Sequence, residues 1–216
     1  MGGLEAAALT ILARVAAMRD DIPEARRLRQ EANAITHNLG ELLTQATDSV
    51  SDGLIELLDE NLPAAEQVLL QGHRALQGMG GAGPGASIAA MLARVYLEQR
   101  RYADAERMAM ECKAKASERQ FDMQIRWRAI WAVVLARRGE QAEAEPLAKE
   151  AVRLALQGDQ LESRAEAHAG LAEVLRLAER REEAANELQK ALDLYNTKGC
   201  ERLAKRVRRE LAALPR

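Results

Sequence analysis

The chain has 216 residues, of which 48% are hydrophobic, 30% are charged and only 3% are aromatic, and its net charge is -2. Its 42 alanines and 30 leucines make up one third of the sequence, a composition typical of an all-α protein. The near-neutral charge disfavours a nucleic-acid partner, because neutralisation of phosphates supplies most of the affinity of such binders. The two cysteines form no C-x-x-C pair, which disfavours a structural zinc site or a disulfide scaffold.

The sequence shows no segment typical of export or membrane insertion. The N-terminal residues lack a basic region followed by an apolar stretch, so no signal peptide is predicted. The longest uncharged run, residues 75–93, contains five glycines and Pro84, and is predicted as a loop joined to a helix start. We therefore expect a soluble, cytoplasmic protein with no membrane partner.

Five similar units follow one another along the chain. Each contains an anchor alanine, and the anchors lie 40, 40, 39 and 40 residues apart: Ala25, Ala65, Ala105, Ala144 and Ala184. A small residue stands twelve positions before each anchor: Ala13, Gly53, Ala93, Ala132 and Ala172. Another stands seven positions after it: Ala32, Gly72, Cys112, Ala151 and Ala191. Such a period indicates supersecondary units that bury their apolar faces against their neighbours.

Each unit is predicted to hold two helices, A and B, with the first small residue on helix A and the other two on helix B. Small side chains let the two backbones approach closely where the helices cross. Pro23 and Pro63 suit the first turn of helix B, and four glycines punctuate helix ends: Gly40, Gly139, Gly158 and Gly199. The helix pairs are expected at about residues 4–39, 41–80, 86–120, 121–159 and 160–199, within one domain spanning 1–216.

The C-terminal tail is predicted to form a capping helix over residues 201–213. Its apolar residues recur every four positions at Leu203, Val207 and Leu211. Its arginines are expected on a basic outer face that keeps the cap soluble: Arg202, Arg206, Arg208 and Arg209. The first helix begins within a few residues of Met1 with no matching cap, so we expect a fragment, or a domain whose upstream neighbour is missing.

The rows of small residues and the two-helix layout resemble the tetratricopeptide repeat (TPR), whose motif has small residues at its eighth, twentieth and twenty-seventh positions. Tyr96 falls where the motif has tyrosine, and four residues fall where it has leucine: Leu12, Leu92, Trp131 and Leu171. The period is 40 rather than 34, and most of the motif's aromatic residues are absent. The resemblance implies a right-handed α-α superhelix, a TPR-like solenoid of five helix pairs plus the C-terminal capping helix.

Two stretches are especially similar to the repeat arms of large bacterial regulators: residues 127–129 with 134–139, and residues 171–178 followed by 191–195 and 198–199. In those proteins an ATPase module precedes a C-terminal superhelix, and a DNA-binding or an adenylate or guanylate cyclase domain lies at the other end. The resemblance implies an interaction or sensor arm of a signalling or transcriptional regulator. No cyclase or nucleotide-binding motif of those proteins lies within this sequence.

The remaining motifs favour structure over chemistry. Residues 78–83 match G-x-G-x-x-G, but a helix precedes them and no Gly-Lys-Ser/Thr follows, so we expect an inter-repeat loop. The histidines, His37, His73 and His168, form no metal-binding motif and are interpreted as packing or surface residues.

The cysteines and carboxylates suggest no reaction either. Cys112 belongs to a small-residue row and is expected in the core, whereas Cys200 opens the cap helix, a position that can be exposed. The many Asp and Glu pairs are expected to be solvated ion-pair partners. We therefore predict no enzyme, with no catalytic residue, no cofactor and no metal.

The concave surface of such a superhelix is lined mainly by helix A. In the repeat register, the candidate partner-binding residues on this face are Arg14, Ser87, Arg94, Arg126, Trp127, Glu166, Glu173 and Arg176. The arginines suit carboxylates of a peptide, which they bind by charge-assisted hydrogen bonds; the alternative is a solvated charged face. Trp131 falls on a core position, and Trp127 either packs or contributes to a binding surface.

These observations favour a non-catalytic scaffold that binds a protein or peptide in its concave groove. An alternative is a small-molecule (inducer) sensor domain that controls oligomerisation, in which the ligand binds the same groove. Self-association through the uncapped first helix is a further possible partnership. A helical-repeat RNA binder would need a basic groove, which the net charge of -2 disfavours.

Overall fold

A computed structural model describes residues 2–40, 42–78 and 83–214. Within these ranges the chain forms eleven α-helices and no strand: α1 (Gly2–Met18), α2 (Ile22–Asn38), α3 (Leu42–Leu58), α4 (Leu62–Gly78), α5 (Gly83–Glu98), α6 (Tyr102–Lys115), α7 (Phe121–Arg137), α8 (Gln141–Ala155), α9 (Leu161–Leu177), α10 (Arg181–Lys198) and α11 (Glu201–Ala213). None of the helices in the described ranges is long and apolar enough to cross a membrane.

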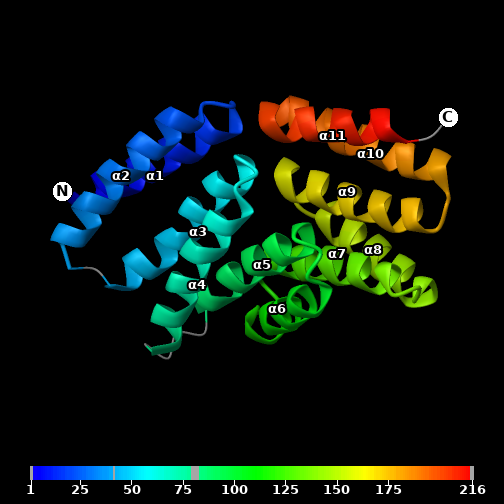
Figure 1. Ribbon diagram of the computed structural model, residues 1–216, viewed down its shortest axis with the longest axis horizontal. Helices are drawn as coiled ribbons and strands as arrows, with labels where there is room; N and C mark the ends of the chain where they lie inside the picture. The colour runs from blue at the N-terminus through cyan, green and yellow to red at the C-terminus, as the bar shows by residue number, and fades with distance from the viewer. Residues whose placement is uncertain (1, 41, 79–82, 215–216) are drawn as a thin grey trace.

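Consecutive helices pair, and the pairs stack side by side in a curved array that ends with α11 (Figure 1). We number the pairs repeats 1 to 5, from α1–α2 to α9–α10. The predicted all-α, TPR-like solenoid with a C-terminal helix is confirmed. Helix α5 begins at Gly83, three residues before the expected start of the third pair. Of the glycine-rich motif, Gly78 ends α4 and Gly83 begins α5, and residues 79–82 lie outside the described residues.

The rows of small residues are the contact surfaces between paired helices. All five anchor alanines and all ten residues of the two flanking rows are buried. In repeat 2 the approach is so close that a Cβ atom at Gly53 would lie 2.6 Å from Leu69 Cγ. A Cβ atom at Gly72 would lie 2.6 Å from the carbonyl oxygen of Ala46 on α3. Close backbone packing therefore explains why these positions carry Ala, Gly or Cys.

The turn from helix A to helix B has one conformation in every repeat. One residue of each turn has a left-handed φ of between 59° and 84°: Asp20, Glu60, Arg100, Gly139 and Glu179. The next N–H then donates to a carbonyl five residues back, as from Asp21 to Ala16 at 2.9 Å, which satisfies the end of helix A. Pro23 lies in the first turn of α2, as predicted.

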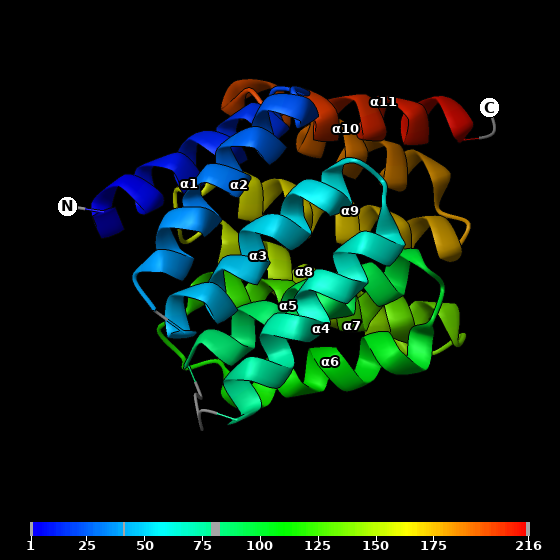
Figure 2. The same ribbon diagram turned by 60° about the vertical axis from the view of Figure 1, so that its left-hand side comes forward.

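The superhelix curves until its last helix meets its first repeats. Helix α11 packs on α10 and also contacts α1, and both views show it beside the turn that joins α1 to α2 (Figures 1 and 2). The Nε atom of Arg202 on α11 donates to the carbonyl oxygen of Leu58, 144 residues earlier in the sequence, at 2.7 Å. The open side of the solenoid is thus bridged by its own C-terminal helix.

Candidate functional site

A cavity of about 420 Å³ lies on the concave side of repeats 3 to 5. Helices α5, α7 and α9, the A helices of these repeats, form most of its wall, and α11 forms another part of it. Five aliphatic side chains give it an apolar lining: Leu97, Ile130, Val133, Leu203 and Val207. The A helices of repeats 3 to 5 therefore supply most of the cavity wall.

Charged side chains surround this apolar lining, and arginines outnumber glutamates. The arginines are Arg94, Arg100, Arg126, Arg137, Arg176 and Arg206. The glutamates are Glu98, Glu166, Glu173 and Glu210. The cavity therefore has an excess of positive charge, although the whole chain carries a net charge of -2.

Arg94 is paired with two glutamates of the cavity wall. Its Nη1 atom donates to Glu166 Oε1 at 2.8 Å and its Nε atom donates to Glu98 Oε1 at 3.3 Å. Burial alone would raise the pKa of Glu98, but the charges of Arg94 and Arg206 outweigh burial and hold that pKa below its usual range. Glu98 therefore stays ionised, and the charge of Arg94 is balanced within the cavity wall.

Two nitrogen atoms of Arg126, Nε and Nη1, make no strong hydrogen bond to the described residues. Its Nε atom is buried and has no hydrogen-bond partner among the described residues; Glu166 Oε2 lies 3.4 Å away. Its Nη1 atom contacts only the weak acceptor Met91 Sδ, at 3.8 Å. The charge of Glu166 raises the pKa of Arg126, which stays a cation. Arg126 forms ion pairs with Glu166 and, from Nη2 at 3.9 Å, with Glu162. Its terminal nitrogens nevertheless make no strong hydrogen bond to the described residues, so a further oxyanion beside them would be stabilised.

Two further groups border the cavity. Glu173 Oε1 accepts from Arg137 Nη2 at 2.5 Å, and both oxygens of Glu173 accept from Arg176 at 2.6 and 2.8 Å. Burial raises the pKa of Tyr195, so this phenol stays protonated and its O–H can donate a hydrogen bond to an anion. The site thus offers a guanidinium and a hydroxyl above an apolar surface.

Five of the eight predicted partner-binding residues meet in this cavity: Arg94, Arg126, Glu166, Glu173 and Arg176. The other three do not line it. Arg14 is exposed on α1, and Ser87 is half-buried on α5. Trp127 is 5% exposed, its Nε1 atom donates to Gln124 Oε1 at 3.0 Å, and the Arg128 guanidinium lies 4.2 Å from its ring centre. Trp127 is therefore buried by packing and does not line the cavity.

The sequence did not identify the residues that α11 and its neighbours add to the site. Arg202 and Arg206 were expected on the outer face of the cap, but both point to other repeats: Arg206 Nη1 donates to Glu98 Oε1 at 2.6 Å. The repeat register cannot place them, because α11 lies outside the repeats. The only available signal was the strongly amphipathic pattern of 201–213, which does not reveal what the basic face meets.

His73, His168 and the two cysteines have structural roles, whereas His37 is exposed. His73 lies 2.7 Å from Glu111 Oε1 and His168 lies 2.6 Å from Glu187 Oε2, and both rings are buried. Cys112 is buried as predicted. Cys200 is also fully buried, contrary to the exposure that its position allowed, and burial raises its pKa to about 11. Within the described ranges, no cluster of His, Cys, Asp and Glu could hold a metal ion.

Comparison with known proteins supports the fold. No protein-family model matches the sequence, and no curated protein matches it. A crystal structure from Podosopora anserina, assigned as a kinesin light chain with nearly identical TPR-like repeats, is 16% identical and superposes with a TM-score of 0.62. A single-substitution variant of it is 15% identical with a TM-score of 0.63. Each match covers 92% of this chain and 98% of the other. At this identity the likeness shows the TPR-like fold alone.

Proposed function

We propose that the chain is a non-catalytic scaffold that binds an acidic segment of a partner protein in its concave cavity. The observation that supports this proposal is Arg126, a cation whose buried Nε has no hydrogen-bond partner among the described residues. A carboxylate of the partner would accept hydrogen bonds from the terminal nitrogens of Arg126 and from the Tyr195 hydroxyl, and charge-assisted bonds of this kind are strong. The aliphatic lining would receive an apolar side chain beside the carboxylate.

The resemblance of residues 127–129, 134–139, 171–178, 191–195 and 198–199 to the arms of bacterial regulators suggests where such a scaffold acts. We propose that it is the interaction or sensor arm of a larger cytoplasmic signalling or transcriptional regulator. A bound partner would then bias the state of the domains joined to the arm.

A selection from a random peptide library tests the binding proposal. The wild-type chain should enrich peptides in which Asp or Glu lies next to an aliphatic residue. Arg126→Gln should weaken binding of these peptides by about tenfold or more, because a hydrogen bond to a charged group contributes about 1.5–3 kcal/mol. Arg119→Gln, which removes the same charge from an exposed position outside the cavity, is the matched control. Enrichment without acidic residues, or equal binding by the two variants, would refute the proposal.

A small-molecule sensor is the second candidate, and the size of the cavity favours it. A volume of about 420 Å³ falls in the range of about 300–1,000 Å³ that is usual for small-molecule sites. Small aliphatic carboxylic acids should then raise the melting temperature of the wild type and not of Arg126→Gln. Stabilisation by free acids but not by acidic peptides would favour the sensor over the scaffold.

A further inference from the structure

Helix α1 presents an uncovered apolar surface. This surface, the α1 patch, consists of five exposed residues: Leu4, Ala8, Ile11, Leu12 and Val15. Leu4, Ala8, Ile11 and Val15 are separated by four, three and four residues, the spacing at which two helices pack against each other. The charged residues of α1, Glu5 and Arg14, lie outside the patch. Pairing of helices through the patch therefore need not bury a charge.

The positions equivalent to the α1 patch are covered in the later repeats. Val15 is 37% exposed, whereas its equivalents, ten residues before the other anchor alanines, are at most 2% exposed: Ile55, Val95, Val134 and Val174. The equivalents of the other patch residues in repeats 2 to 5 are all buried or half-buried. In repeat 5 the equivalent of Ile11 is Gly170, where a Cβ atom would lie 3.1 Å from Ala129 Cβ on α7. The α1 patch is therefore the surface through which one repeat packs on the repeat before it.

Among the described residues, the α1 end of the chain is where exposed large hydrophobic side chains gather. Leu4, Ile11, Leu12 and Val15 belong to the α1 patch, and three more lie where α2 leads into α3: Leu39, Leu42 and Leu43. The remaining two, Phe121 and Leu156, lie in repeat 4 on different helices and form no row. The best apolar match for the α1 patch in this chain is therefore the same patch of a second copy.

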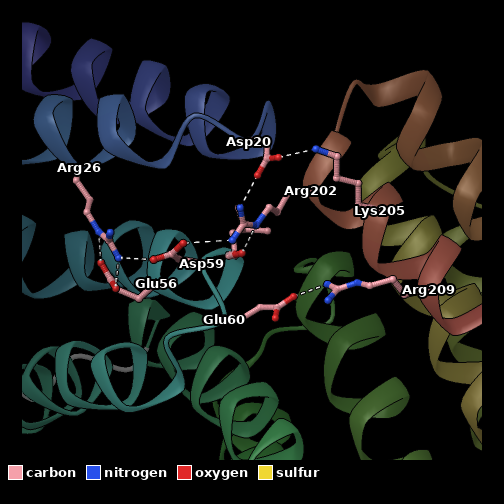
Figure 3. Close-up of polar contacts among 9 residues, drawn as sticks. Asp20, Arg26, Glu56, Asp59, Glu60, Arg202, Lys205 and Arg209 are labelled. Atoms are coloured by element: carbon pink, nitrogen blue, oxygen red, sulfur yellow. Dashed lines mark hydrogen bonds and ion pairs between the residues drawn. The ribbon is translucent and has the colours of Figure 1, made fainter.

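The C-terminal end of the superhelix does not match the α1 patch. The exposed residues of α11 are charged residues and alanines: Lys205, Arg208, Arg209, Glu210, Ala212 and Ala213. Three basic residues of α11 are paired with the A-to-B turns of repeats 1 and 2 (Figure 3): Arg202, Lys205 and Arg209. Head-to-tail association would place the α1 patch against these charges, and their desolvation is costly. Contact of patch with patch across a two-fold axis buries apolar groups against apolar groups.

The size of this surface suits a weak dimer. Leu39 extends the α1 patch, because its Cδ1 atom lies 3.6 Å from the place where Gly2 would carry a Cβ atom. The exposed parts of Leu39 and of the four large patch residues equal about three complete side chains, or about 300 Å² in each copy. Because homodimer interfaces are about two-thirds apolar, two copies would bury about 900 Å² in total. Interfaces below about 1,200 Å² belong to weak, reversible complexes.

We propose that two copies of this chain associate through their α1 patches, across a two-fold axis, into a reversible dimer. Repeat 1 of each copy then takes the place that a preceding repeat has in the rest of the superhelix. Such a contact uses the same surface of both copies, so it closes on itself and admits no third copy.

Sedimentation velocity of the full chain between about 5 and about 500 μM tests the proposal. The weight-average mass of the wild type should rise from 23.8 kDa toward twice that value. Leu12→Glu should weaken the association by about tenfold or more, because each dimer would bury two unpaired carboxylates. Leu156→Glu is the matched control, because Leu12 and Leu156 are both 54% exposed and Leu156 lies outside the patch. The control should dimerise like the wild type.

Two further measurements complete the test. The dimer should be as strong or stronger in about 1 M sodium chloride, because salt screens charges and not apolar burial. Ile11→Lys is the second variant if Leu12→Glu does not fold by circular dichroism, and it should lose association to the same extent. A wild type that stays at 23.8 kDa at every concentration, assemblies larger than a dimer, or dissociation by salt would overturn the inference. Equal association of the patch variant and Leu156→Glu would overturn it as well.

Discussion

Replacement of Gly72 by alanine should destabilise the protein, although alanine is the better helix former. The new Cβ atom would lie 2.6 Å from the backbone oxygen of Ala46 and 2.6 Å from Ser49 Cβ on α3. Because ordinary contacts begin at about 3.4 Å and a backbone oxygen cannot rotate away, α3 and α4 must separate by nearly an ångström. Overpacking of this kind costs about 1–3 kcal/mol, against a gain in helix propensity of about 1 kcal/mol. We expect a net loss of up to about 2 kcal/mol.

The assay is urea unfolding followed by far-UV circular dichroism, which gives the free energy of unfolding. Gly78→Ala is the matched control, because Gly78 is exposed at the end of α4 and no atom lies within 4 Å of the Cβ that would be added. The control should be neutral or stabilised by up to about 1 kcal/mol. If Gly72→Ala were as stable as Gly78→Ala, close helix approach would not be the reason for the small-residue rows.

Three further results are expected. Arg29→Ala should lower the free energy of unfolding in urea by about 3–5 kcal/mol, because Arg29 is 3% exposed and pairs with a carboxylate of α3 at 2.7 Å. Arg27 is exposed, so Arg27→Ala should lower it by less than about 1 kcal/mol. Similar losses for the two variants would contradict this prediction. Cys112 and Cys200 should not react with Ellman's reagent in the native protein at pH 8, because burial raises their pKa values to about 12 and about 11; rapid native reaction would contradict this. Ion pairing lowers the pKa of Asp20 in the folded protein, so the stabilisation from its carboxylate should be present at neutral pH and lost as the pH falls below 3.8. The unfolding free energies of wild type and Asp20→Asn should therefore differ at pH 7 and converge in acid.

The repeat architecture could be predicted because the same pattern of small residues, which close helix packing requires, recurs five times along the sequence. Where two helices cross closely only small side chains fit, so Ala25 and its equivalents recur at a fixed spacing and are all buried. The same register placed Arg94, Arg126 and Glu166 on helix A of successive repeats. They meet in one cavity because the repeats stack with little rotation between neighbours.

The closure of the superhelix could not be predicted in this way. It depends on the sum of small rotations between repeats, which no single residue determines. The basic face of residues 201–213 was therefore interpreted as a solvated outer surface, whereas Arg202 and Arg206 reach across to repeats 1, 2 and 3. Trp127 was weighed as a groove residue, but the phase of α7 turns it into the interior, where Gln124 and Arg128 hold it.

Closure by α11 supplies one wall of the cavity, and zero-length crosslinking with a carbodiimide tests this closure directly. Lys205 Nζ lies 2.7 Å from Asp20 Oδ2, although 185 residues separate them. Lys115 and Glu111, one turn apart on α6 at 2.6 Å, are the local reference. In dilute wild-type protein, mass spectrometry should find an intramolecular amide between Lys205 and Asp20 beside the reference crosslink. Formation of the reference crosslink without the Lys205–Asp20 crosslink would contradict a closed superhelix.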